Sequence, residues 1–139
     1  MLRALDIKEV AFGLDHPETG SSLRNLGGLF ERRGNYEKAE MFLFQALEII
    51  EKNFGANHER TAYILNDLAV FYANQEQYPR AEQLLIRALE IEKKIFEPNH
   101  LSLATRFNNL AEIYRKMGNY DYAEINIQKA LSILSLIHI

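Results

Sequence analysis

Three histidines recur along the chain at a constant interval, and histidine is the side chain that most often binds metal ions. His16, His58 and His100 are 42 residues apart, and each follows an Asp or an Asn. If the interval marks a structural repeat, equivalent loops lie ~10 Å apart, whereas metal–nitrogen bonds are ~2 Å long. The three imidazoles therefore cannot share one ion. We expect each histidine to cap the following helix and to pack in the linker, and we expect no metal site.

Carboxylates and paired glycines are the other residues that could carry chemistry. Glu37 and Glu40 each match an acidic residue in another repeat, which is typical of a scaffold role. Gly27-Gly28 lies inside a helical pattern, so we interpret it as a close-packing point and not as a phosphate-binding loop. No nucleophile stands in a pattern that would give it a base. We therefore expect no catalytic residue, no cofactor and no enzymatic activity.

Composition excludes several classes of function. The chain has 139 residues, which suggests one domain, and no cysteine. Its 16 Lys and Arg against 19 Asp and Glu argue against nucleic acid or an anionic membrane as partner. No apolar run approaches the roughly 20 residues that span a bilayer. The first ten residues are charged throughout and lack a secretory apolar segment. We expect a cytoplasmic protein.

One seven-residue motif occurs three times and shows that the chain repeats every 42 residues. GNYEKAE (34–40) returns as EQYPRAE (76–82) and as GNYDYAE (118–124). Alignment at 42 residues gives nearly every apolar or small position a counterpart in all three units. These columns are Leu23, Leu65 and Phe107; Leu26, Leu68 and Leu110; Gly27, Ala69 and Ala111; Phe30, Tyr72 and Tyr114; Tyr36, Tyr78 and Tyr120; Ala39, Ala81 and Ala123; Leu43, Leu85 and Ile127; Ala46, Ala88 and Ala130; and Leu47, Leu89 and Leu131.

The apolar spacing within each unit predicts two helices and no strand. Apolar residues recur at intervals of three, four and seven, which places them on one helix face. Gly34-Asn35 and Gly118-Asn119 are suited to the left-handed turn that ends a helix. Small residues would let the two helices approach closely, with the Phe30 and Tyr36 columns filling the remaining space. We predict first helices near 17–33, 59–75 and 101–117, second helices near 36–53, 78–95 and 120–133, and a leading helix at 2–12.

In these features the chain resembles the tetratricopeptide-repeat (TPR) proteins. The resemblance rests on SSLRNLGGLFERRGNYEKAEMFLFQALEI (21–49) and on the linkers FGLDHPET, FGANHERT and FEPNHLSL. The long unit is similar to the repeats of kinesin light chain and to those of many bacterial multi-repeat proteins. The resemblance implies an all-α, right-handed α-solenoid. Its parts would be the second helix of a truncated preceding repeat (1–13) and three repeats (17–55, 59–97 and 101–133).

In that family the first helices line a concave groove that binds an extended peptide or a partner helix. The resemblance places the groove at four columns of mostly non-apolar residues. They are Arg24, Asn66 and Asn108; Asn25, Asp67 and Asn109; Gly28, Val70 and Glu112; and Arg32, Asn74 and Lys116. An asparagine amide offers donors and an acceptor, so a row of them could pair with the backbone of any extended chain. The alternative, that these are solvated polar faces, stays open for each single residue.

A better-known version of this groove holds the C-terminal carboxylate of heat-shock chaperones. Its five positions correspond here to Arg24, Gly28, Asp67, Thr105 and Asn109. Arg24 alone keeps the required character, and the Asp67 carboxylate would repel another carboxylate. We therefore do not expect this chain to bind chaperone tails.

The two ends of the chain interrupt the repeat pattern. The start falls inside a second helix that lacks its first helix. At the other end LSLIHI (134–139) replaces the charged residues of the earlier units. This hexapeptide matches one reading frame of a sequencing-library adapter, so we interpret it as a read-through scar on a fragment of a longer, bacterial protein. End helices without polar caps would also allow self-association.

Three hypotheses for function follow. The first is a non-catalytic interaction module whose groove binds a peptide or helix of another protein. In the second, the repeats stack or oligomerise and the groove holds no ligand. The third makes the chain the sensor region of a larger bacterial signalling enzyme whose catalytic domain lies outside it. The sequence does not identify the partner.

Overall fold

The computed structural model describes residues 16–137 of the chain, and this part consists of six α-helices joined by short loops. The first helix of each repeat, called a first-type helix below, is α2 (Pro17–Arg32), α4 (Glu59–Asn74) or α6 (Leu101–Lys116). The second helix of each repeat, called a second-type helix below, is α3 (Tyr36–Phe54), α5 (Tyr78–Ile95) or α7 (Tyr120–Ile137). The described part contains no strand. The all-α prediction is confirmed, and the leading helix predicted at 2–12 lies outside the described residues.

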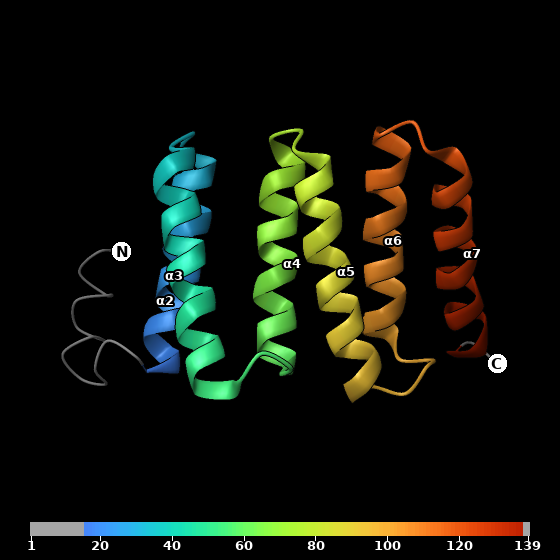
Figure 1. Cartoon of the computed structure of the whole chain (residues 1–139), viewed down its shortest axis with the longest axis horizontal. Helices are drawn as coiled ribbons and strands as arrows, with labels where there is room; N and C mark the ends of the chain where they lie inside the picture. Colours follow the sequence, from blue (N-terminus) through green and yellow to red (C-terminus); the bar gives the residue numbers. More distant parts are fainter. Residues whose placement is uncertain (1–15, 138–139) are drawn as a thin grey trace.

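The helices form three antiparallel hairpins that stand side by side in chain order (Figure 1). α2 packs on α3, α4 on α5 and α6 on α7, with further contacts from α3 to α4 and from α5 to α6. The described ends of the chain therefore lie at opposite ends of a row (Figure 1). No hairpin can cover its own apolar faces, so the core runs through the row as an α-solenoid.

The turn inside each hairpin needs one residue with positive φ. Gly34 has φ 79° and Gly118 has φ 81°, which confirms the predicted left-handed turns. The middle hairpin places Glu76 at the equivalent position with φ 62°. A side chain in this region costs roughly 1–2 kcal/mol, which glycine avoids. The middle copy of the repeated motif, EQYPRAE (76–82), therefore keeps the same turn, but Glu76 carries backbone strain there.

The small residues of the repeat lie where the helices approach most closely. Ala39, Ala46, Ala81 and Ala88 are fully buried. A Cβ added to Gly27 would lie 2.9 Å from the Leu43 side chain, so a larger residue there would collide with α3. These positions explain why the alanine and glycine columns recur. For Gly27 the predicted close packing is confirmed.

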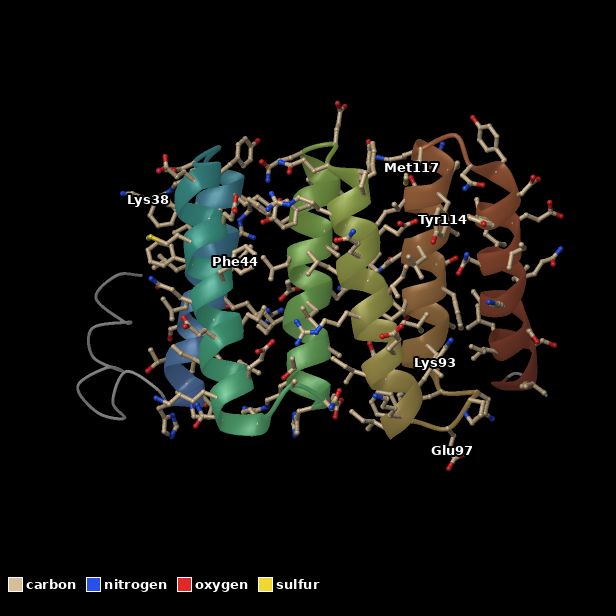
Figure 2. The ribbon with its side chains drawn as sticks, viewed as in Figure 1. Lys38, Phe44, Lys93, Glu97, Tyr114 and Met117 are labelled. Atoms are coloured by element: carbon tan, nitrogen blue, oxygen red, sulfur yellow. The ribbon has the colours of Figure 1, made fainter. Side chains whose placement is uncertain are left out.

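The aromatic columns differ from one another. Tyr72 and Tyr114 are buried, and Tyr114 lies between α6 and α7 (Figure 2). Tyr36 and Tyr120, by contrast, are 48% and 69% exposed. The prediction that the Tyr36 column fills the space between helices is therefore wrong for these two residues. Their position at the start of the second helix places the ring at the rim of the hairpin, where Tyr36 meets Phe71 edge-on.

Helix α7 runs beyond its predicted end at residue 133 and reaches Ile137. Leu134, the first residue of the suspected scar, packs against the core. Apolar residues without Gly or Pro continue a helix readily, so this extension is expected from the chemistry of the segment whatever its origin. The division of the chain into repeats and scar stays a prediction, and residues 138–139 lie outside the described part.

Candidate partner-binding groove

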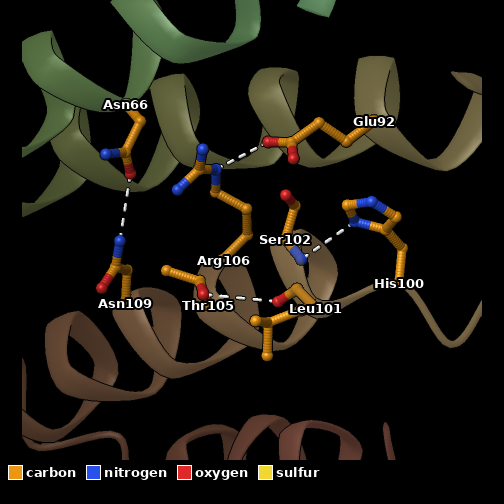
Figure 3. Close-up of polar contacts among 8 residues, drawn as sticks. All are labelled: Asn66, Glu92, His100, Leu101, Ser102, Thr105, Arg106 and Asn109. Carbon is orange, nitrogen blue, oxygen red and sulfur yellow. Dashed lines mark hydrogen bonds and ion pairs between the residues drawn. The ribbon is translucent and has the colours of Figure 1, made fainter. Parts of the chain in front are cut away.

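The three first-type helices are joined by polar contacts that cross from one repeat to the next. Arg24 of α2 forms an ion pair with Asp67 of α4. The Asn109 amide of α6 donates to the Asn66 side-chain oxygen at 3.0 Å (Figure 3). Both contacts link residues 43 positions apart, one more than the repeat period. They place α2, α4 and α6 in register along one face of the row.

A third contact of the same offset lies about two helical turns beyond the Arg24–Asp67 pair on α2 and α4. The Asn74 amide donates to the Glu31 carboxylate at 3.0 Å. Several residues of the candidate set therefore use part of their hydrogen-bonding capacity inside the stack. An asparagine has more donor and acceptor positions than the single bond uses. Asn74 and Asn109 consequently hold the helices together and still present polar groups to solvent.

Two cavities lie on this face. The larger has a volume of about 420 Å³ and lies between α2 and α4, with one residue of α3. The smaller has a volume of about 180 Å³ and lies between α4 and α6, with Leu85 of α5 at its base. Val70 lines both cavities and is 43% exposed. The two cavities therefore form one interrupted groove centred on α4.

The larger cavity contains more of the candidate residues than the smaller. It is lined by Arg24, Asn25, Gly28, Glu31, Arg32, Leu43, Asp67 and Val70. The smaller is lined by Ala69, Val70, Ala73, Asn74, Leu85, Asn109, Glu112, Ile113 and Lys116.

Two candidates, Asn66 and Asn108, line neither cavity. Asn66 is half-buried against Asn109, and Asn108 is exposed beside the groove.

Some lining residues were missed by reasoning from the sequence. Leu43 and Leu85 belong to the apolar column of the second helices, so the pattern assigns them to the core. Each is nearly fully buried but reaches the base of a cavity. Glu31 lies beside the predicted Arg32 and could have been found by extending the groove columns by one residue. The structure therefore gives the groove an apolar floor beneath polar walls.

The charges along the groove are partly paired. Burial raises the pKa of Asp67 above its ordinary value, and the adjacent Arg24 guanidinium offsets this only in part. A hydrogen bond from Arg115 lowers the pKa of Glu112. Among the described residues Arg32 and Lys116 belong to no ion pair, and both are exposed in the last turn of their helices. Cations there complement the negative helix end.

The three repeated histidines act as helix caps. Nδ1 of His16, His58 and His100 each accepts a hydrogen bond of 3.1 Å from the backbone N–H two residues later. Figure 3 shows this contact from Ser102 to His100. The rings of His58 and His100 stack on Phe54 and Phe96. This confirms the predicted capping for all three histidines and the predicted linker packing for His58 and His100, while Asp15 lies outside the described residues.

One buried charged pair lines neither cavity and was not predicted. Arg106 of α6 donates to Glu92 of α5 at 2.6 Å, and both side chains are buried (Figure 3). The repeat columns contain a usable signal, since Glu92 aligns with Ile50 and Arg106 with Ile64. Two charged residues that enter neighbouring apolar columns together indicate a pair, because each alone would be costly to bury.

The hairpin row, the small-residue columns and the polar groove define a helical-repeat protein. The family model for tetratricopeptide repeats matches residues 1–52 and 60–135. The chain therefore belongs to the tetratricopeptide-repeat family, whose repeats generally act as non-catalytic scaffolds for protein–protein interaction. No curated protein matches the chain.

Solved structures confirm the fold, and one of the similar structures is a putative kinesin light chain. BtubC (BKLC) from P. vanneervenii superposes with a TM-score of 0.88 at 26% identity, covering 97% of this chain and 54% of that one. A putative kinesin light chain from Podosopora anserina, with nearly identical TPR-like repeats, gives 0.80 at 22% identity, covering 96% and 63%. The chain thus spans less than two-thirds of the length of each of these structures.

A more distant structure shares the fold alone. The N-terminal domain of stress-induced protein-1 (STI-1) from C. elegans superposes with a TM-score of 0.67 at 15% identity, covering 84% of this chain and 85% of that one.

Two searches of the described residues complete the description. None of the helices among residues 16–137 combines the length and the apolarity that crossing a membrane requires. The same residues contain no group of three or more His, Cys, Asp or Glu side chains arranged to hold a metal ion.

Proposed function

We propose that the chain binds an extended peptide, or a helix, of a partner protein in the groove formed by α2, α4 and α6. The observation that carries the proposal is the position of Val70. This apolar residue is 43% exposed at the centre of the groove and lines both cavities. An apolar contact surrounded by amide and charged groups is the arrangement that recognises a peptide, because the apolar part gives affinity and the polar rim fixes orientation.

Polar groups on both sides of Val70 support the same reading. Asn25 is exposed on α2, and Asn109 keeps hydrogen-bonding capacity beyond its contact with Asn66. A peptide backbone offers donors and acceptors at regular intervals, which amide side chains can meet without regard to peptide sequence. The exposed cations Arg32 and Lys116 lie near the two ends of the groove. The ligand is therefore a protein segment, and the chain itself supplies no catalysis.

The experiment compares the same kind of substitution at two exposed positions, one that lines the groove and one that does not. Val70 and Ile86 are both exposed β-branched residues, 43% and 36% accessible, and Ile86 lines none of the cavities described. The purified chain is used to select peptides from a displayed library of random sequences, and Val70→Lys and Ile86→Lys are tested with the selected peptides. We expect Val70→Lys to weaken binding at least tenfold and Ile86→Lys to leave it unchanged.

Other outcomes of that experiment contradict the proposal. Equal binding by the two variants would place the ligand outside the groove. Failure of the wild-type chain to enrich any peptide would remove the groove as a peptide site. Circular dichroism of both variants checks that helix content is retained, since both positions are exposed.

A second role, self-association, is favoured by the exposure of α7. Leu131 is 57% exposed, although the equivalent Leu47 and Leu89 are 8% and 6% exposed beneath the next hairpin. Burial of such a face against a second copy would be favourable. We propose that two copies associate through it at high concentration. Sedimentation should show a concentration-dependent dimer that Leu131→Lys abolishes, and a monomer at all concentrations would contradict the proposal.

We also propose a role for this chain within a longer protein. Because the chain covers only 54% and 63% of the two kinesin-light-chain-like structures, further repeats or domains are compatible with the family. The alternative function is that of a cytoplasmic sensor region in a larger bacterial signalling enzyme. Sequencing the complete gene decides it: a catalytic domain in the same reading frame supports the alternative, and an array of repeats alone contradicts it.

A further inference from the structure

Gly27 and Gly28 are adjacent, yet the structure gives them different surroundings. A Cβ at Gly27 would collide with Leu43, which accounts for that glycine by packing. A Cβ at Gly28 would meet no atom within 4 Å outside its own helix backbone and chain neighbours. The prediction that both glycines form a close-packing point is therefore wrong for Gly28. Packing within the described residues does not require a glycine at this position.

A glycine in the interior of a helix lowers its stability relative to alanine, so Gly28 carries a cost that no contact in the fold offsets. The open space beside it belongs to the larger cavity, whose volume is about 420 Å³. Ligand pockets in proteins commonly measure roughly 300–1,000 Å³. Because Gly28 lines this cavity, its missing side chain leaves a cavity of ligand size larger than it would otherwise be.

The repeat provides an internal comparison. Val70 and Glu112 occupy the position of Gly28 in the next two first-type helices. Both carry side chains, and the cavity beyond Val70 is smaller, at about 180 Å³. The fold accepts the branched side chain of Val70 and the long side chain of Glu112 at this position. The opening at Gly28 is therefore a feature of the first repeat and not a consequence of the fold.

The surroundings of the opening favour an apolar occupant. Leu43 and Val70 provide its apolar surfaces. Of the charged groups that line the opening, Arg24 pairs with Asp67 and Glu31 accepts from Asn74, while Arg32 is exposed in the last turn of α2. An apolar side chain placed against Leu43 and Val70 would gain contact area, whereas a charged side chain placed against these two residues would lose water. The exposed Asn25 amide remains available to the peptide backbone.

We infer that the opening at Gly28 is a specificity subsite that receives one bulky apolar side chain of the bound peptide. The inference rests on the proposed function and adds to it the position and the kind of residue recognised. The Gly28 position controls which residue the peptide can present, because a side chain at position 28 would occupy the same space. Gly28 therefore acts through shape and donates no hydrogen bond from a side chain.

The test fills the opening. Gly28→Leu has room in the unliganded chain and should fold with equal or greater stability. Gln45→Leu is the matched control, because it adds the same side chain at an exposed position of α3 that lines none of the cavities described. Peptides selected from the random displayed library on the wild-type chain are measured against both variants. We expect at least tenfold weaker binding for Gly28→Leu and no change for Gln45→Leu.

An alanine scan of a selected peptide completes the test. On the wild-type chain, one bulky apolar residue of the peptide should lose at least tenfold in affinity when replaced by alanine. On Gly28→Leu the same replacement should have little effect, since the two groups compete for one space. Equal losses on both chains, or equal binding by Gly28→Leu and the wild type, would overturn the inference and leave the groove intact. Failure to enrich any peptide would instead contradict the proposed function itself, and this inference with it.

Discussion

Glu92 and Arg106 form a buried ion pair at the junction between the second and third repeats, where the preceding junction has Ile50 and Ile64 at the equivalent positions. All four side chains are buried, with exposed fractions between 2% and 8%. The same packing position thus accepts two apolar residues in one junction and two opposite charges in the next. The chain provides its own reference for the contribution of the pair to stability.

The first prediction separates the pair from its members. Arg106→Ile leaves the Glu92 carboxylate buried without its cation and should destabilise the chain by about 3–5 kcal/mol. The double variant Glu92→Ile/Arg106→Ile reproduces the residue types of the preceding junction and should be as stable as the wild type or more stable. Urea denaturation measures both. A double variant that is less stable than the wild type would show that the pair contributes more than apolar packing can replace.

The second prediction concerns the strained turn in the middle hairpin. Glu76 has φ 62° at the position that glycine occupies in the other two hairpins. Glu76→Gly should raise the free energy of unfolding by roughly 0.5–1 kcal/mol, because relief of strain exceeds the greater freedom of glycine in the unfolded chain. Thermal melting measures the change. Glu76→Ala is the control and should give no comparable gain, since alanine has the same conformational restriction.

The helix boundaries could be predicted from sequence because capping and turn residues mark them. His16, His58 and His100 begin three helices, and Gly34 and Gly118 end two hairpin turns, where the pattern placed them. The stagger between neighbouring repeats could not be predicted. A period of 42 aligns equivalent residues, but contacts such as Asn109 to Asn66 depend on how far one hairpin slides against the next.

The different roles of Gly27 and Gly28 also escaped prediction. Adjacent residues on a helix point about 100° apart, so one faces α3 and the other faces the cavity. Sequence alone gives two identical residues in a helical pattern. The buried Glu92 and Arg106 were missed for a related reason, because their columns were read for apolar content and not for paired exceptions.

The third prediction concerns the histidine caps. His58 accepts a hydrogen bond from the backbone of Arg60 and stacks on Phe54. His58→Ala should destabilise the chain by about 1 kcal/mol, since an N-cap acceptor is lost. His58→Asn retains a capping oxygen and should recover most of that loss. Denaturation midpoints compare the two variants, and identical midpoints for both would show that stacking, and not capping, is the larger contribution.

The fourth prediction is a loss of stability at alkaline pH. Burial, followed by a hydrogen bond to Glu82, raises the pKa of Tyr114 from 10.0 to about 12. The unfolded chain therefore loses this proton at lower pH than the folded chain does. The stabilising contribution is complete below pH 10 and is lost as pH rises toward 12. Tyr114→Phe should reduce the fall in denaturation midpoint across this window, and an unchanged slope would contradict the assignment.

The central claim is that the face formed by α2, α4 and α6 holds the ligand, and methyl resonances test it most directly. Val70 and Leu43 lie in the groove, whereas Ile86 and Ile125 are exposed on the second-type helices. A library-selected peptide is titrated into the chain with labelled Ile, Leu and Val methyl groups. The account predicts that the Val70 and Leu43 methyl signals shift and that those of Ile86 and Ile125 remain in place. Shifts confined to Ile86, Ile125 or Leu131, with Val70 unchanged, would contradict it.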